Sequence, residues 1–274
     1  AIRVDVKISA VKVGEKSAKF ILADKSGNKL LCKDIALEDT EGMVQGSMMA
    51  EVEKVIPWDN RSPYLYEAFI EVYENGQLAE VVFYRVGFRR LEIIDKVMYL
   101  NGKRLILTGV NRHEWNAKTG RVIGMDEMIS DMKCVKRNNI NAVRTCHYPD
   151  QILWYYMCDE EGIYLMSETN LESHGSFQKL GAIEPSCNVP GSIPQWKEAV
   201  IDRARNNFET FKNHTSVLFW SLGNESYAGD NIEAMNQYFK DKKDGRLVHY
   251  ESSYYNRAYE DTISDIESRM YAKT

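Results

Sequence analysis

The sequence has few cysteines, no long apolar run and no excess of basic residues. Its five cysteines are scattered over 274 residues without a Cys-x-x-Cys pair, a pattern that argues against a disulfide scaffold or a zinc ribbon. No run reaches the roughly 18 uncharged apolar residues of a membrane span. Lys and Arg number 35 against 40 Asp and Glu, so nucleic acid is not an expected partner. We expect a cytoplasmic protein with free thiols and no membrane contact.

Residues 1–87 have the period-two pattern of antiparallel strands. Apolar and charged residues alternate over residues 3–8, and Asn75-Gly76 separates two strand-like runs. Asn-Gly favours a tight hairpin because both residues tolerate positive φ. No long helical stripe interrupts this part. The pattern predicts an immunoglobulin-like β-sandwich over residues 1–87.

Residues 88–274 alternate strand-length apolar runs with stripes at helical spacing, which predicts a parallel sheet. Polar residues cluster just after the strands, as they do in a (β/α)8 TIM barrel, and no glycine-rich phosphate loop follows any strand. These 187 residues are fewer than the roughly 250 of a whole barrel. We therefore expect an incomplete barrel of about six β/α units, with its strands at 105–110, 142–144, 163–166, 217–220, 247–250 and 265–266.

Two sets of polar residues at the strand ends are candidates for chemistry. Glu225 follows an apolar strand, and a carboxyl group in a partly desolvated pocket can donate a proton near neutral pH. A surface glutamate that caps the next turn is an equal alternative on spacing alone. Glu172 and His174 are two residues apart and project to one side of an extended chain, where they could bind a hard divalent cation with Glu225. A solvated loop is the alternative for this pair.

Other candidates are less specific. His113 and His147 each lie within two residues of a strand end, where a histidine that only satisfies the core is also common. Arg144 lies inside a strand and needs a buried carboxylate partner, which a purely structural ion pair would also provide. Trp115, in a loop after the first barrel strand, could stack on a sugar ring.

At these motifs the chain resembles glycoside hydrolase family 2, and in particular its large bacterial β-galactosidases. The motifs occur in order over essentially the whole chain, which makes chance agreement improbable. They are Val-Gly-Phe-Arg at 86–89, Asn-Gly-Lys at 101–103, Gly-Val-Asn-Arg-His-Glu at 109–114, Asn-Ala-Val-Arg at 141–144, His-Tyr-Pro at 147–149, Asn170, Glu172, His-Gly at 174–175, Trp-Ser-Leu-Gly-Asn-Glu-Ser at 220–226 and Met-Tyr at 270–271.

The resemblance implies a role for each matching residue. Glu225 corresponds to the general acid/base of a retaining double displacement, and Glu172, His174 and Glu225 correspond to Mg²⁺ ligands. The residues that correspond to groups contacting the galactosyl unit are His113, His147 and Asn224. Those that correspond to neighbours of the nucleophile are Arg144 and Tyr271.

The sequence also departs from the family pattern. The segment that carries the nucleophilic glutamate is absent from the 274 residues, and Glu251 matches a different family position. Ser167 and Cys146 stand where Asp and Ser are usual. We therefore expect an inactive fragment of an enzyme that removes terminal β-galactose from galactosides such as lactose.

Further expectations concern assembly and specificity. We expect the parent enzyme to be a homo-oligomer, and the fragment to self-associate through the open edges of its barrel. A β-glucuronidase is the alternative enzyme, although its motif usually reads Asn-Glu-Pro rather than Asn224-Glu225-Ser226. A non-catalytic carbohydrate-binding module is the alternative from another class.

Overall fold

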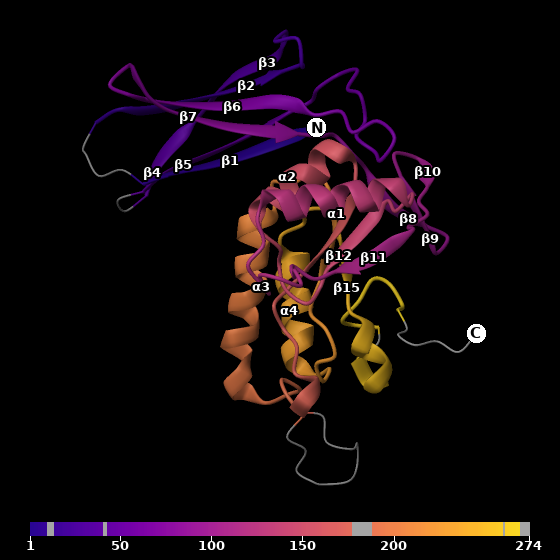
Figure 1. Cartoon of the computed structure of the whole chain (residues 1–274). Helices are drawn as coiled ribbons and strands as arrows, with labels where there is room; N and C mark the ends of the chain where they lie inside the picture. Colours follow the sequence, from indigo (N-terminus) through magenta and orange to yellow (C-terminus); the bar gives the residue numbers. More distant parts are fainter. Residues whose placement is uncertain (10–13, 41–42, 177–187, 260, 269–274) are drawn as a thin grey trace. The chain divides into compact units, whose positions relative to one another are not determined.

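The computed structural model of the chain divides into two compact units, Ala1–Arg89 and Arg90–Thr274, each drawn in Figure 1. It describes residues 1–9, 14–40, 43–176, 188–259 and 261–268. In this part of the chain no helix is long and apolar enough to cross a membrane.

The first unit consists of two antiparallel sheets, which confirms the predicted immunoglobulin-like sandwich. One sheet has the order β1 (Ile2–Ser9), β5 (Met43–Ala50), β4 (Leu37–Thr40). The other has the order β3 (Lys29–Ile35), β2 (Lys16–Ala23), β6 (Tyr66–Glu74), β7 (Gln77–Val86). Asn75 and Gly76 join β6 to β7 with φ of 50° and 76°, the positive values that a type I′ turn requires.

The core of this unit follows from the period-two alternation. Val4 and Val6 of β1 and Phe20 and Leu22 of β2 are buried in one cluster, to which Met48 of β5 also belongs. Because side chains two residues apart point to the same face of a strand, each sheet turns one apolar face toward the other.

The second unit begins with a small antiparallel sheet and continues as a five-stranded parallel sheet with helices between the strands. The small sheet contains β8 (Leu91–Ile94), β9 (Val97–Leu100) and β10 (Lys103–Arg104). The parallel strands, in spatial order, are β11 (Gly109–Arg112), β12 (Ala142–Thr145), β13 (Tyr164–Glu168), β14 (Val217–Ser221) and β15 (Leu247–His249). This consecutive order is that of a partial TIM barrel.

Within the described residues, four helices connect these strands in turn, and short 3-10 turns occupy some of the loops. The helices are α1 (Met125–Arg137), α2 (Ile152–Glu161), α3 (Lys197–Phe211) and α4 (Asp230–Asp241). The 3-10 turns are His174–Ser176, Pro194–Trp196, Glu251–Tyr255 and Arg257–Tyr259.

Two predicted strands differ from the structure. The strand predicted at 105–110 begins only at Gly109, because the amide of Leu105 donates to the carbonyl of Met98 in the preceding small sheet. The sixth strand, predicted at 265–266, is a single bridge between His249 and Ile266. In both segments, tertiary pairing rather than composition decides the conformation.

The helices and strands of this unit share one apolar core. α3 and α4 pack side by side (Figure 1), and their buried residues Phe208 and Phe239 belong to the same cluster as Leu165 of β13 and Val217 of β14. Alternation along a strand sends every second residue to this core and leaves the others for the opposite face.

Substitution of Leu165 tests the packing of this core. Leu165 is fully buried, whereas Leu153 of α2 is 45 % exposed. We expect Leu165→Ala to lower the free energy of unfolding by about 2–5 kcal/mol through lost burial and a residual cavity, and Leu153→Ala to change it by less than about 1 kcal/mol. Urea denaturation followed by tryptophan fluorescence measures both, and equal losses would contradict the assigned core.

Candidate active site

Polar side chains from neighbouring strands meet at the carboxyl end of the parallel sheet. Glu168 pairs with Ser221 in the register of β13 and β14, and Ser221 pairs with His249 in that of β14 and β15. The Ser221 hydroxyl donates to Glu168 Oε2 at 2.6 Å and lies 3.2 Å from His249 Nδ1. The three strands thus present one row of hydrogen-bonded polar groups.

Arg144 of β12 forms an ion pair with Glu168, one member of this row. Its Nε donates to Glu168 Oε2, and its Nη2 lies 3.0 Å from Asn224 Oδ1 and 3.5 Å from Glu251 Oε2. The Glu168 side chain is fully buried and that of Arg144 is 13 % exposed. Within the described residues, the buried carboxylate partner of Arg144 is Glu168.

Glu168 also orients a histidine. His147 Nδ1 lies 2.6 Å from Glu168 Oε1, so Nδ1 carries the proton that this carboxylate accepts and Nε2 is left for other partners. The amide of Glu168 donates to the hydroxyl of Thr145 at 2.9 Å, which holds the carboxylate in place. Burial, and then the nearby ring of His147, lower the pKa of His113.

The loop after β14 carries Asn224 and Glu225. Gly223 has φ of 149°, and a Cβ at this position would lie 2.6 Å from the carbonyl oxygen of Leu171. That carbonyl accepts the amide of Asn224 at 2.8 Å. Only glycine fits where these two backbones approach each other so closely. This close approach positions Asn224 and Glu225, which follow Gly223.

Glu225 has a strained backbone that a second carboxylate holds. Its φ is 30°, a value that costs a non-glycine residue of order 1–3 kcal/mol. The amide of Glu225 donates to Glu251 Oε1 at 2.9 Å. Because Glu251 also contacts Arg144, the buried ion pair and the backbone of Glu225 belong to one network.

Of the three predicted cation ligands, the structure brings the side chains of His174 and Glu225 into contact. His174 Nδ1 lies 3.2 Å from Glu225 Oε2, and Glu172 forms a backbone bridge with Asn224. Glu172 and His174 are exposed, as a loop that admits a hydrated ion requires. Within the described residues, the tighter group of three possible ligands is a different one, His113, Cys146 and His147, whose ligand atoms lie within 4.8 Å of one another.

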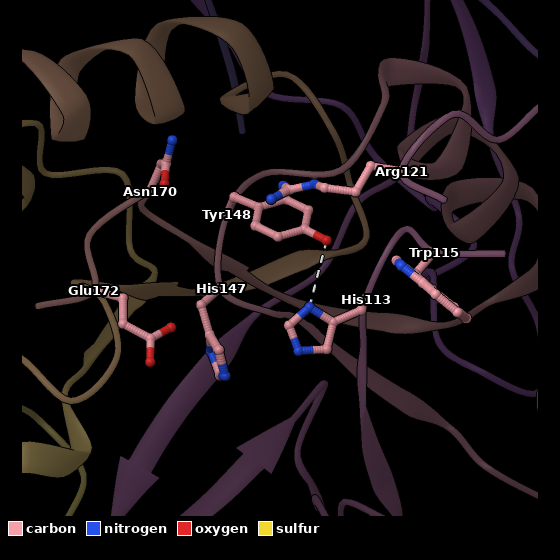
Figure 2. A pocket seen from close by; sticks show the side chains of 7 residues that line it. All are labelled: His113, Trp115, Arg121, His147, Tyr148, Asn170 and Glu172. Carbon is pink, nitrogen blue, oxygen red and sulfur yellow. Dashed lines mark hydrogen bonds between the residues drawn. The ribbon is translucent and has the colours of Figure 1, made fainter. Parts of the chain in front are cut away.

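A pocket of about 540 Å³ opens beside these groups, a volume in the range of small-molecule sites. Figure 2 shows His113, His147 and Glu172 along one side and Trp115 at the edge. Trp115 is 62 % exposed, which agrees with a rim position. The full lining is His113, Trp115, Arg121, His147, Tyr148, Asn170 and Glu172.

The structure therefore places eight of the nine predicted residues near this end of the sheet. The ninth, Tyr271, lies outside the described residues. Sequence reasoning did not select Glu168, Ser221 and Glu251, which connect the others. The signal available for Glu168 was its position, since it ends a buried strand next to the strand of Arg144.

His249 makes folding stability depend on pH. Burial, and then Arg144, lower the pKa of His249 to about 4, below the value of about 6.5 in an unfolded chain. The unfolded state therefore takes up the proton first as pH falls, so stability is lost between about pH 6.5 and 4, at up to about 1.4 kcal/mol per pH unit.

We accordingly expect the variant His249→Asn to lose less stability than the unmodified protein over that interval. Urea denaturation at several pH values measures the two slopes. Parallel curves between pH 6.5 and 4 would show that His249 does not cause the dependence.

Comparison with known proteins identifies the family. Residues 91–274 match the model "Glycosyl hydrolases family 2, TIM barrel domain", and residues 1–89 match the model "Glycosyl hydrolases family 2". The β-galactosidase large subunit of Lactobacillus acidophilus is 59 % identical over 250 residues, which are 90 % of this chain and 39 % of that protein. The large subunit of Lactobacillus helveticus is 59 % identical over 263 residues, 94 % of this chain and 41 % of that protein.

Solved structures agree with this fold. A β-glucuronidase from Ruminococcus gnavus in complex with uronic isofagomine has a TM-score of 0.67 and 25 % identity, covering 90 % of this chain and 41 % of that one. The chain spans about two fifths of the length of these relatives. It belongs to glycosyl hydrolase family 2.

Proposed function

We propose that this chain carries the acid/base part of the active site of a retaining β-galactosidase. The observation that carries the proposal is Glu225, whose carboxylate is 13 % exposed and contacts His174 and the Asn224 amide at the edge of the sheet. The similarity to β-galactosidase large subunits supports the choice of substrate.

In a retaining mechanism one carboxylic acid protonates the leaving oxygen while a second carboxylate attacks the anomeric carbon. Glu225 would give its proton to the glycosidic oxygen and later take one from the water that releases the sugar. The strained, hydrogen-bonded backbone fixes the direction of this carboxyl group, and such positioning contributes to the rate.

The second carboxylate is proposed to come from a part of the protein outside these 274 residues. Retaining enzymes hold the two carboxyl groups about 5–5.5 Å apart. Glu251 contacts the Glu225 backbone but is 3 % exposed and already accepts from Glu225, Ser252 and Arg144. Burial raises the pKa of Glu251. These contacts support a role in bracing Glu225 rather than in attacking substrate.

The pocket supplies the groups that the substrate would contact. His113 and His147 line it with ring nitrogens, and Asn224 lies beside Glu225. Hydrogen bonds from such groups to sugar hydroxyls give orientation, and Trp115 offers a flat apolar face at the rim. A terminal galactosyl unit fits this combination of polar wall and aromatic edge.

Mg²⁺ is the proposed cofactor, with Glu172, His174 and Glu225 as its protein ligands. Two carboxylates and an imidazole on exposed loops suit a cation that keeps several waters. When bound, Mg²⁺ would supply positive charge beside the acid/base group. His174 already lies next to Glu225, and the backbone bridge from Glu172 to Asn224 keeps the third ligand close.

A β-glucuronidase is the alternative that one observation favours. Arg121 lines the pocket with its guanidinium 4.3 Å above the ring of Tyr148, and a guanidinium can pair with a uronic carboxylate. The solved structures similar to this chain include β-glucuronidases. The higher identity to β-galactosidases favours the galactoside.

Assembly and location are further parts of the proposal. Relatives named large subunits support a multi-subunit enzyme, and β11 and β15 end the described parallel sheet, where further strands can pair. If light scattering of the full-length protein gave the mass of a single chain, this assembly would be contradicted. Free thiols at Cys32, Cys134, Cys146 and Cys158 support a reducing, cytoplasmic location, which fractionation of the source cells would test.

The acid/base role predicts a dependence on the leaving group. In the full-length protein we expect Glu225→Gln to lower kcat/KM for lactose by about 10²–10⁴-fold. The loss for a dinitrophenyl galactoside should be smaller, because that leaving group departs without protonation. Glu198→Gln, an exposed change on α3, is the control. Equal losses on both substrates, or faster turnover of a glucuronide, would contradict the proposal.

The cation proposal predicts a change in metal requirement. We expect Glu172→Gln to raise the Mg²⁺ concentration for half-maximal activity by at least about 10-fold, since one anionic oxygen ligand is lost. Activity measured against Mg²⁺ after treatment with a chelator gives this value. Glu198→Gln should follow the unmodified protein, and an unchanged requirement in Glu172→Gln would count against these ligands.

A further inference from the structure

Cys146, His113 and His147 form a cluster with metal-binding chemistry, and its two histidines line the pocket. One ligand atom from each side chain lies within 4.8 Å of the other two. The rings of His113 and His147 are 5.3 Å apart between centroids, in an edge-to-face arrangement. Figure 2 shows the free ring nitrogen of His113 on the side that faces His147.

Hydrogen bonds prepare both imidazoles as ligands. His147 Nδ1 bonds to the buried carboxylate of Glu168 at 2.6 Å, so Nε2 is the ring nitrogen available to a metal ion. His113 Nδ1 lies 3.4 Å from the hydroxyl of Tyr148. A carboxylate behind a histidine is the usual outer partner of a metal-bound imidazole, because it fixes the tautomer and raises the basicity of the ligand.

The donor set differs from the one proposed for Mg²⁺. A thiolate and two imidazoles suit borderline and soft ions such as Zn²⁺, whereas Mg²⁺ prefers oxygen. Zn²⁺ binds nitrogen and sulfur at about 2.0–2.3 Å, so the three side chains need to close by about 1 Å around the ion. Rotation of His113, which is exposed, can provide this movement.

We propose that His113, Cys146 and His147 form a second metal site, selective for Zn²⁺ and similar transition ions, whose occupation blocks the sugar pocket. Three protein ligands leave a fourth position open. Since His113 and His147 line the pocket, an ion held by them removes both nitrogens from contact with a sugar. The cysteine proton passes to solvent when the ion binds.

The inhibition part of this inference rests on the proposed function, whereas the binding part does not. The binding test therefore uses Co²⁺ alone as a spectroscopic probe, added to the purified protein in excess Mg²⁺ so that the oxygen-rich site is filled. A Co²⁺–thiolate bond gives a charge-transfer absorption that carboxylate and imidazole ligands do not give.

We expect this absorption in the unmodified protein, its removal by added Zn²⁺, and its loss in Cys146→Ser. Cys134→Ser is the matched control, because Cys134 is an exposed cysteine on α1. The Co²⁺ absorption of Cys134→Ser should equal that of the unmodified protein. We also expect Cys146→Ser to weaken Zn²⁺ binding by at least about 100-fold, since loss of an outer partner alone costs about 10–100-fold. Circular dichroism confirms that each variant is folded.

The outcomes are distinct. Absence of the absorption in the unmodified protein, or its persistence in folded Cys146→Ser, would overturn the site. If Co²⁺ binds as expected, Zn²⁺ should raise the KM for a nitrophenyl galactoside in the unmodified full-length enzyme and raise it far less in full-length Cys146→Ser. Binding without any effect on KM would overturn the blocking role alone. A full-length enzyme without galactosidase activity would overturn the proposed function and leave the absorption result standing.

Discussion

The ion pair between Arg144 and Glu168 is the interaction on which the site depends. Both groups lie in the middle of a parallel sheet, where a charge without a partner is strongly destabilising. Glu168 is fully buried, and Arg144, His147 and Ser221 all bond to its two oxygens. Loss of Arg144 would remove the guanidinium that pairs with the fully buried Glu168 carboxylate, and loss of Glu168 would leave Arg144 with only the longer contact to Glu251. The pair therefore fixes the side chains of three neighbouring strands relative to one another.

Hydrogen bonds link this ion pair to Asn224 and, through Glu251, to the backbone of Glu225. Arg144 contacts Asn224 and Glu251, and Glu251 accepts the amide of Glu225. The positive φ of Glu225 is thus held by a carboxylate that the ion pair itself positions. These contacts hold the backbone of Glu225 and so help to fix its carboxyl group, as the outer partners of functional groups commonly do.

Two kinds of donor lie near this end of the sheet. Glu172, His174 and Glu225 offer mainly oxygen, and His113, Cys146 and His147 offer nitrogen and sulfur. Hard and borderline ions differ in the donors they prefer. His147 both lines the pocket and belongs to the nitrogen–sulfur group. A single carboxylate, that of Glu168, orients this shared side chain.

The sequence by itself determined the two-part architecture, because period-two alternation and helical spacing are local patterns that burial then enforces. The Asn75-Gly76 hairpin and the strands at 142–144 and 217–220 follow from such patterns. Glu225 and Arg144 were also visible, as charges in or directly after apolar strands. Only the tertiary structure decided that Glu168 is the partner of Arg144 and that Glu251 holds the amide of Glu225. Those contacts join residues 24 and 26 positions apart, and strand register, not local composition, brings them together.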